Sequence, residues 1–416
     1  MRESPTVEKL ALDGGRPVRE HPFPGRVLYG EEAERLVLEA LRSQSLFGIG
    51  GPMHGAFERE FAAFYGAGQG VACSSGTAAV HVALSALDLE PGSEVITAPI
   101  TDAGTIAPIL FQQCVPVFAD IDEHYGMDPA AIERLITPRT AAILVVHLFG
   151  AACDMRSIGE LARSRGIPLI EDCSQSHAIQ LDGRWLGRWG DIGAFSLQQS
   201  KFLATGDGGV VITDNDTYAS RMRAFRDKGW FRDDPGSRHY SLLGLNYRLT
   251  ELQAAVGRAQ LPELRARVER RHRLGRRLAE RLERLDGVSP QRQTPGSEHG
   301  YWQFALEVDP DSWDPPDFAR ALRAEGVPAG FGYTGDPIYL CMRPLADGRT
   351  FGSSSIPLRT DDGSVIAYER GLCPRAESLL GRVLTLSLNE QFADEDIDDM
   401  AEATEKVARL LPQRRS

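Results

Sequence analysis

Over the first half of the chain, short continuous apolar runs alternate with longer segments in which apolar residues recur every three or four positions. The short runs indicate strands buried on both faces, and the wider spacing indicates amphipathic helices. An alternation of this kind predicts an α/β fold whose mostly parallel central sheet is covered by helices. We predict strands at residues 71–73, 94–99, 115–119, 141–148 and 167–172, and helices at residues 32–43, 56–65, 78–87, 104–113, 129–136 and 155–165.

The pattern changes after residue 190. Two apolar runs, at residues 193–196 and 209–213, predict two strands joined by a loop that carries Lys201. An arginine-rich helical pattern then extends from Leu249 to Leu285 as a connector. Strand and helix patterns return over a smaller area and predict an α+β C-terminal domain, while residues 334–372 are rich in Gly, Pro, Ser and Asp and predict a loop. We therefore expect an N-terminal arm (residues 1–30), a large domain (31–260) and a smaller C-terminal domain (261–416).

Composition and charge narrow the class of protein. The chain of 416 residues carries 46 basic against 58 acidic residues, a net charge of −12 that disfavours nucleic acid or an anionic membrane as partner. The longest apolar stretch, Ala141–Cys153, contains His147, and the N-terminus lacks the apolar segment of a signal peptide. Six scattered cysteines without a CxxC pair are typical of a reducing compartment. We expect a cytoplasmic enzyme or binding protein.

Lysine is scarce in this sequence. Only four lysines, at positions 9, 201, 228 and 406, occur among the 46 basic residues. Arginine serves surfaces well but cannot form a Schiff base, so a lysine kept in an arginine-biased chain is a candidate for chemistry. Lys201 alone lies between a strand-like apolar run and a glycine cluster, Gly206-Asp-Gly-Gly.

Two polar segments follow predicted strands. Ser74-Ser-Gly-Thr77 stands between a strand and a helix, where backbone N–H groups and hydroxyls bind phosphate well. The alternative is a simple helix cap, which is the commoner use of such residues. Asp172 in Glu171-Asp-Cys-Ser-Gln-Ser-His177 ends a parallel strand, where open α/β sheets place ligands; the alternative is a cap on the next helix.

Lys201 completes the set. Small residues and glycine turns around it allow a planar ligand to approach, and desolvation would lower the pKa of its amine and make the amine nucleophilic. The alternative is a surface lysine in a glycine-rich loop. Together, a phosphate cradle, a carboxylate and a lysine meet the needs of pyridoxal 5′-phosphate (PLP) for its phosphate, its ring nitrogen and its aldehyde.

Several segments resemble one family, the DegT/DnrJ/EryC1/StrS aminotransferases. They are Ser75-Gly-Thr-Ala-Ala, Val146-His-Leu-Phe-Gly, Glu171-Asp-Cys-Ser-Gln-Ser-His, Gly193-Ala-Phe-Ser, Lys201 before Gly206-Asp-Gly-Gly, and Asn246-Tyr-Arg-Leu-Thr-Glu-Leu-Gln-Ala-Ala. The similarity is dense from about residue 30 to residue 260. It implies a PLP enzyme of fold type I, which is aspartate aminotransferase-like, that aminates a keto-sugar or keto-cyclitol from an amino-acid donor.

The resemblance also implies residue roles. Lys201 would carry the cofactor as a Schiff base, Asp172 would hold the ring nitrogen, and Gln175 would contact the ring hydroxyl side. The phosphate end would be bound by Ser75, Gly76, Thr77 and Ser196, joined by Asn246 from the partner subunit of a homodimer. Two positions depart from the family pattern: Asp102 follows Thr101 where an aromatic residue usually stacks on the cofactor ring, and Asp207 replaces a glutamate.

Two short segments resemble one branch of the family, and the residues and motifs present weigh against three other classes of protein. Gln198-Gln199 and Leu10-Ala-Leu-Asp-Gly-Gly-Arg-Pro-Val-Arg resemble the enzymes that aminate scyllo-inosose and 2-deoxy-scyllo-inosose with L-glutamine, although L-glutamate is a second possible donor. One rival is a dehydratase of the same fold, which usually has histidine in place of Lys201. A non-catalytic sensory homologue would have lost Lys201, Asp172 or Thr77. A dinucleotide-dependent dehydrogenase is disfavoured because no GxGxxG follows the first strand.

Overall fold

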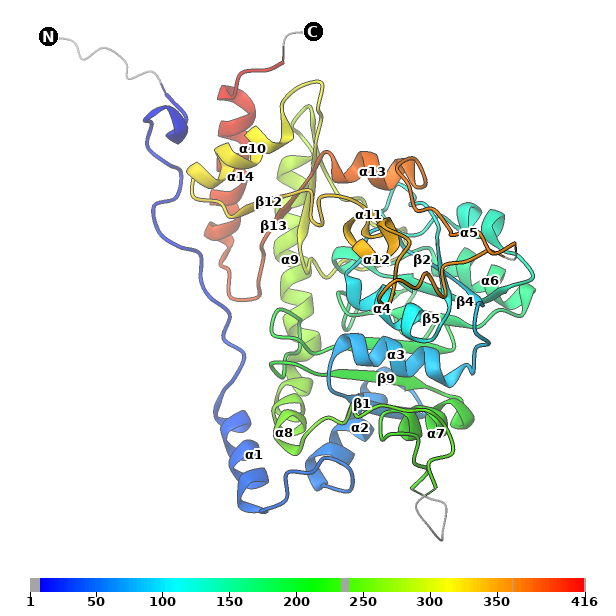
Figure 1. Cartoon of the computed structure of the whole chain (residues 1–416). Coiled ribbons are helices and arrows are strands. Elements are labelled where there is room, and N and C mark those ends of the chain that lie inside the picture. The colour runs from blue at the N-terminus through cyan, green and yellow to red at the C-terminus, as the bar shows by residue number, and fades with distance from the viewer. Residues whose placement is uncertain (1–7, 233–238, 361, 415–416) are drawn as a thin grey trace, which may run out of the picture.

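The computed structural model describes residues 8–232, 239–360 and 362–414. In these residues the chain forms a seven-stranded sheet in the order β1-β9-β8-β5-β4-β2-β3 (Figure 1). Neighbouring strands are parallel except in the pairs that involve β9, which runs antiparallel to both β1 and β8. The predicted α/β fold with a mostly parallel sheet is therefore confirmed. The strands are β1 (Gln69–Cys73), β2 (Glu94–Thr97), β3 (Val115–Phe118), β4 (Thr140–Val146), β5 (Leu169–Asp172), β8 (Ile192–Ser196) and β9 (Gly209–Thr213).

Helices bury their apolar sides on both faces of this sheet. Alternate residues of β4 show the division, because Ile143 joins the core formed with α2, α5, α6 and α8, whereas Leu144 joins the core formed with α3, α4 and α7. The predicted helices are present, and α7 is an additional one that the pattern did not reveal. They are α1 (Glu31–Arg42), α2 (Pro52–Tyr65), α3 (Gly76–Ala86), α4 (Ala103–Phe111), α5 (Pro129–Leu135), α6 (Met155–Arg165), α7 (Asp216–Phe225) and α8 (Glu251–Gln260).

A second, antiparallel sheet lies beyond the long helix α9 (Leu264–Leu282). Its strand order is β10-β11-β13-β12, and α10 and α14 pack on it around a third apolar core (Figure 1). The segment 334–372, predicted as loop, contains two short helices and is otherwise irregular. The elements are β10 (Val288–Pro290), β11 (Phe304–Val308), β12 (Ala329–Phe331), β13 (Val383–Leu386), α10 (Pro315–Ala324), α11 (Ile338–Cys341), α12 (Arg343–Ala346), α13 (Pro374–Leu380) and α14 (Asp394–Leu410).

Residues 8–30 form an extended arm that runs past α14 and α10 down to α1 (Figure 1). The buried carboxylate of Glu325, at the end of α10, accepts hydrogen bonds from the backbone N–H groups of Ala11 at 2.8 Å and Val18 at 3.1 Å. The ammonium of Lys406 in α14 lies 2.8 Å from the same carboxylate. The arm is thus bound to the C-terminal helices. Within the described ranges, each helix is too short or too polar to cross a lipid bilayer.

Candidate active site

A cavity of about 370 Å³ opens where the parallel strands β2, β4, β5 and β8 end, the edge of the sheet at which open α/β folds bind ligands. The starts of α3 and α4 and the segments that follow β5 and β8 form most of its wall. Trp302, just before β11, and Tyr333, just after β12, close it from the second sheet. The cavity brings together seven of the predicted site residues: Ser75, Gly76, Thr77, Asp172, Gln175, Ser196 and Lys201.

The start of α3 has the helix cap that was one interpretation of its sequence. The Ser75 hydroxyl oxygen accepts a hydrogen bond from the N–H of Ala78 at 3.0 Å. The first N–H groups of a helix have no carbonyl partner within it, so those of Gly76 and Thr77 can still serve an anion. A Cβ on Gly76 would lie 2.5 Å from the Cβ of Ser196. Glycine at position 76 therefore allows Ser196 of β8 to lie close to the start of α3. The Ser75 cap leaves the N–H groups of Gly76 and Thr77 available to an anion.

Asp172 ends β5 with both carboxylate oxygens hydrogen-bonded. Oδ1 accepts the N–H of Ser174 at 3.0 Å, and Oδ2 accepts the hydroxyl of Thr105 at 2.9 Å. Thr105 in turn lies 2.7 Å from the hydroxyl of Thr101. The alternative that Asp172 caps a helix is wrong, because the chain turns at Ser174 and continues into the short strand β6 (Gln180–Leu181). These partners fix the carboxylate at the floor of the cavity.

Lys201 lies in the loop between β8 and β9, as predicted, with its amine inside the cavity. Its Nζ is 4.0 Å from the centroid of the Trp302 ring. Burial lowers the pKa of Lys201 to about 8, although the carboxylates of Asp172 and Asp102 oppose this by stabilising the ammonium. A usable fraction of the amine is therefore neutral near physiological pH and can act as a nucleophile. Lys201 is not an ordinary surface lysine.

The other three lysines have different surroundings. Lys406 is buried and paired with Glu325, Lys228 lies 5.9 Å from the ring centroid of Tyr240, and Lys9 is exposed on the arm. All four lysines lie in the described part of the chain, and of these only Lys201 lines the cavity.

Gln175 has a fixed amide orientation. Its carbonyl oxygen accepts the N–H of Phe149 at 2.8 Å, and its amide nitrogen donates to the hydroxyl oxygen of Tyr333 at 3.0 Å. The ring of Tyr333 packs edge-on against Phe149, with centroids 4.9 Å apart. Burial raises the pKa of Tyr333 to about 12, so its hydroxyl stays protonated. Gln175 therefore connects the wall formed by the large sheet to the wall formed by the second sheet.

Comparison with known proteins agrees with this geometry. The profile of the DegT/DnrJ/EryC1/StrS aminotransferase family matches residues 28–350. The chain belongs to this family.

Individual relatives extend over nearly the whole chain. The L-glutamine:2-deoxy-scyllo-inosose aminotransferase of Streptomyces kanamyceticus is 36% identical, with 96% of each chain covered. A UDP-N-acetyl-3-dehydro-alpha-D-glucosamine 3-aminotransferase of Acidithiobacillus ferrooxidans is 35% identical over 87% of this chain and 93% of its own. The structure of S. venezuelae DesV in complex with a ketimine intermediate superposes with a TM-score of 0.81 at 29% identity, over 91% of this chain and 95% of that one. The protein is a PLP-dependent aminotransferase of fold type I.

The cavity of this aminotransferase fits the cofactor. The glycine at position 76 leaves room beside Ser196, and a Cβ on Gly104 would lie 2.5 Å from the hydroxyl oxygen of Thr77. A larger side chain at position 76 or 104 would therefore collide with Ser196 or Thr77 beside the start of α3, where a phosphate needs close approach of the backbone. Asp172 and the Lys201 amine face the same space. The residues present supply an anion site, a carboxylate and an amine in one cavity.

Asp102 is the clearest departure from the family pattern. Its Oδ1 accepts the N–H of Gly104 at 2.7 Å, which makes Asp102 the N-cap of α4 at the mouth of the cavity. Asp102 therefore caps α4 and supplies no aromatic ring. The aromatic side chains that line the cavity are Trp302 and Tyr333. The spacing of strands and helices contained no signal for either aromatic residue, because both enter from the second sheet. Asp207, the second departure, lies at the exposed rim.

Two residues of the predicted motifs lie elsewhere. Asn246 is exposed and pairs through its backbone with Asp227; it is not among the described residues that line the cavity. His177 is buried with its ring centroid 5.5 Å from that of Phe195 and 5.9 Å from that of Phe202. Burial and the nearby Lys201 lower the pKa of His177 to about 3, so the imidazole is neutral. His177 belongs to the core under the loop that carries Lys201.

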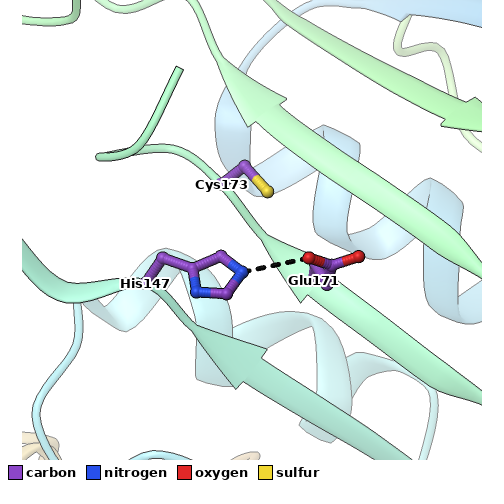
Figure 2. Close-up of side chains that lie close together, drawn as sticks. All are labelled: His147, Glu171 and Cys173. Atoms are coloured by element: carbon purple, nitrogen blue, oxygen red, sulfur yellow. Dashed lines mark hydrogen bonds and ion pairs between the residues drawn. The ribbon is translucent and has the colours of Figure 1, made fainter. Parts of the chain in front are cut away.

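Glu171, the neighbour of Asp172 in β5, points toward His147 (Figure 2). Since side chains alternate along a strand, Glu171 lies on the face opposite Asp172. The Glu171 carboxylate accepts the N–H groups of Gly187, Trp189 and Gly190 at 2.7–2.8 Å and lies 3.1 Å from Nε2 of His147. The N–H of Cys153 donates to Nδ1 of His147 at 3.2 Å, and Nε2 faces the Glu171 carboxylate, so hydrogen bonds hold both ring nitrogens.

Cys173 lies beside this pair, and its ligand atom falls within 4.8 Å of those of His147 and Glu171. Burial raises the pKa of the Cys173 thiol to about 12, so the sulfur is protonated. Both nitrogens of His147 and both oxygens of Glu171 are already used in hydrogen bonds. This group is a closed structural network rather than a metal centre.

Proposed function

We propose that this aminotransferase transfers the amino group of L-glutamine to the ketone of an uncharged cyclitol of the 2-deoxy-scyllo-inosose type, in aminoglycoside or related biosynthesis. The observation that carries the proposal is the single cavity that holds Lys201, Asp172 and the start of α3. Similarity to the S. kanamyceticus enzyme supports the donor and the acceptor.

The charge of the cavity supports a cyclitol over a sugar nucleotide. The ionisable side chains that line it, apart from Tyr333, are three carboxylates, Asp102, Asp172 and Asp207, and one amine, Lys201. A nucleotide diphosphate would bring additional negative charge to the exposed carboxylates at the mouth and rim, whereas a cyclitol would not. The hydroxyl groups of a cyclitol can also donate hydrogen bonds to these carboxylates.

The residues have distinct tasks in this reaction. When bound, PLP supplies an aldehyde that condenses with amines and a ring that withdraws electrons from the carbon next to the nitrogen. The Asp172 carboxylate, held by Thr105 and Ser174, would keep a proton on the ring nitrogen because an opposite charge stabilises it. The N–H groups of Gly76 and Thr77 and the Ser196 hydroxyl would bind the phosphate.

Lys201 moves the proton. With PLP bound, the Lys201 amine would hold the cofactor through its aldehyde; when free, it would act as general base at the donor α-carbon and as general acid that returns the proton to the cofactor. The low pKa of Lys201 suits both tasks, because the amine is near its midpoint at physiological pH. Gln175 is fixed by Phe149 and Tyr333 and would contact the hydroxyl side of the cofactor ring.

Chemical trapping tests the role of Lys201. Borohydride reduction of the PLP-loaded protein should fix the cofactor to the peptide that contains Lys201. Fixation at Lys228, or at no lysine, would overturn the assignment. The substrates are then tested in half-reactions: L-glutamine should bleach the absorbance of the cofactor faster than L-glutamate, and a keto-cyclitol should restore it. Restoration only by a keto-sugar nucleotide would exclude the cyclitol.

We further propose that the smallest active unit is a homodimer in which Asn246 reaches the cofactor phosphate of the neighbouring subunit. Asn246 is exposed, and the side chains of Leu243 and Leu245 beside it are 93% and 41% exposed. Large exposed apolar side chains next to a polar residue are typical of a surface that another chain covers.

Mixed dimers test this shared site. Asn246→Asp would place a carboxylate against the phosphate and weaken cofactor binding. Mixing this variant with Lys201→Ala should restore activity above that of either parent, because one site of the mixed dimer is then intact. If subunits exchange but activity does not return, Asn246 does not act across the interface.

A further inference from the structure

The loop between β8 and β9, residues 197–208, is called the lysine loop here. Its two ends pair with each other: Leu197 N–H donates to Gly208 O at 2.7 Å, and Gln199 N–H donates to Gly206 O at 2.9 Å. The carbonyl groups of its tip are instead bound by other parts of the chain. Trp302 donates its indole N–H to the carbonyl oxygen of Ser200 at 3.1 Å.

The N-terminal arm binds the tip on both sides of Lys201. The Arg26 guanidinium donates to the carbonyl oxygen of Lys201 at 2.9 Å and to that of Phe202 at 3.4 Å. Three residues further along the arm, the Tyr29 hydroxyl donates to the side-chain oxygen of Gln199 at 2.7 Å. A segment separated from Lys201 by about 170 residues therefore holds its backbone.

Arg26 is itself held by a buried pair of charges. Its guanidinium lies 3.0 Å from the Glu390 carboxylate, whose other oxygen accepts the Nε–H of Arg271 at 2.7 Å. The side chains of Glu390 and Arg271 are 3% and 2% exposed. A carboxylate between two guanidinium groups with this little solvent fixes both in one geometry. The position of Arg26 is therefore set by α9 and by the segment after β13.

We propose that Arg26 is a positioning residue for the catalytic lysine: it holds the carbonyl group of Lys201 in place so that the amine returns to the same point in each half-reaction. The proposal rests on the proposed function of Lys201. A lysine side chain has four rotatable bonds, so a fixed backbone narrows the region that its amine can reach. In general, a displacement of about 1 Å of a reacting group can lower the rate about 100-fold.

A matched pair of variants tests this role. Arg19 is a second arginine of the arm that binds carboxylates of the C-terminal helix, Asp396 and Asp399, each at 2.7 Å, and no hydrogen bond of Arg19 to the lysine loop occurs among the described residues. R26Q should lower kcat at least about tenfold while KM for the amino donor changes less than about threefold, because positioning acts on the chemical step. R19Q should change neither.

Two further readouts separate positioning from general loss of structure. In the PLP-loaded protein, the pH midpoint of the absorbance change should shift in R26Q and stay in R19Q, since the protonation of the lysine nitrogen depends on its location. In the cofactor-free protein, amide hydrogen exchange in residues 199–204 should accelerate in R26Q only. R26K keeps a charge opposite Glu390 but loses the fork that spans two carbonyl groups, so its kcat should lie between those of R26Q and the wild type.

The inference is overturned if R26Q and R19Q lower kcat equally, or if R26Q raises KM and leaves kcat and the absorbance midpoint unchanged. Should R26Q not fold, a wild-type kcat in R26K would overturn it. If instead the proposed function of Lys201 is wrong, borohydride would fix no cofactor at Lys201 in the wild type. That result separates failure of the proposed function from failure of the inference about Arg26. Hydrogen exchange would still report whether Arg26 holds the lysine loop.

Discussion

Glu171 and Asp172 are adjacent carboxylates of one strand with opposite surroundings. Asp172 faces the cavity and accepts two hydrogen bonds, from the Thr105 hydroxyl and the Ser174 N–H. Glu171 faces the other side, is fully buried and accepts four, three of them from backbone N–H groups of residues 187–190.

The two carboxylates differ in how many of their acceptor positions the protein already uses. An ionised carboxylate can accept about four hydrogen bonds, so the protein saturates Glu171 and leaves capacity on Asp172. The alternation of side chains along a strand puts the two only one residue apart. Glu171 thereby ties the turn after β7 (Arg184–Trp185) to the strand that presents Asp172.

The largest effect is expected at the saturated carboxylate. Glu171→Gln replaces one acceptor oxygen by an N–H₂ group that must face backbone N–H donors, which leaves buried donors unpaired. We expect the free energy of unfolding, measured by urea denaturation of the cofactor-free protein, to fall by about 3–5 kcal/mol. A loss below about 1 kcal/mol would mean that the network of His147 and Glu171 is not structural.

The opposite result is expected one residue later. Asp172→Asn keeps the size of the side chain and an oxygen for the Ser174 N–H, and the Thr105 hydroxyl can accept a hydrogen bond from the new NH₂ group, but the charge is removed from the cavity. We expect turnover to fall at least about 100-fold, while stability changes by less than about 1 kcal/mol. Turnover within about threefold of the wild type would remove Asp172 from the mechanism.

The smallest effect concerns the pH dependence of Lys201. In the cofactor-free protein, acylation of Lys201 by a neutral reagent should rise with pH and reach half its maximum near pH 8, where burial places the pKa. The charge of Asp172 raises that pKa, so Asp172→Asn should shift the midpoint to lower pH. Glu171→Gln should not move it, and peptide mass spectrometry gives the extent of labelling. An unshifted midpoint in the Asp172 variant would show that its charge does not reach the amine.

Some elements of the fold could be predicted from the local pattern of apolar residues, and others could not. The strands at residues 141–148 and 167–172 were recognised because uninterrupted apolar runs indicate burial on both faces. The antiparallel direction of β9 could not be predicted, since an apolar run does not show which strands it pairs with or in which direction. Helix α7 was missed because charged and apolar residues are mixed through residues 216–225.

Some residues of the candidate site could likewise be predicted from the sequence, and others could not. Asp172, Lys201 and the start of α3 could be proposed from residue types next to strand ends, and the structure brings them into one cavity. Trp302 and Tyr333 could not, because their approach depends on how the second sheet packs against the first. The catalytic and cofactor-binding roles of the individual residues remain predictions for the experiments above.

The attachment of the arm has a consequence for synthesis on the ribosome. Residues 8–30 are made before Glu325, Glu390 and Lys406, which bind them. During translation these contacts of the arm can form only after α10, the segment after β13 and α14 have been made. Because Glu390 holds Arg26, the contact of Arg26 with the backbone of Lys201 is complete only once the segment after β13 has been made. A chain that stops before α14 would lack Lys406 and, with it, a hold on residues 8–30.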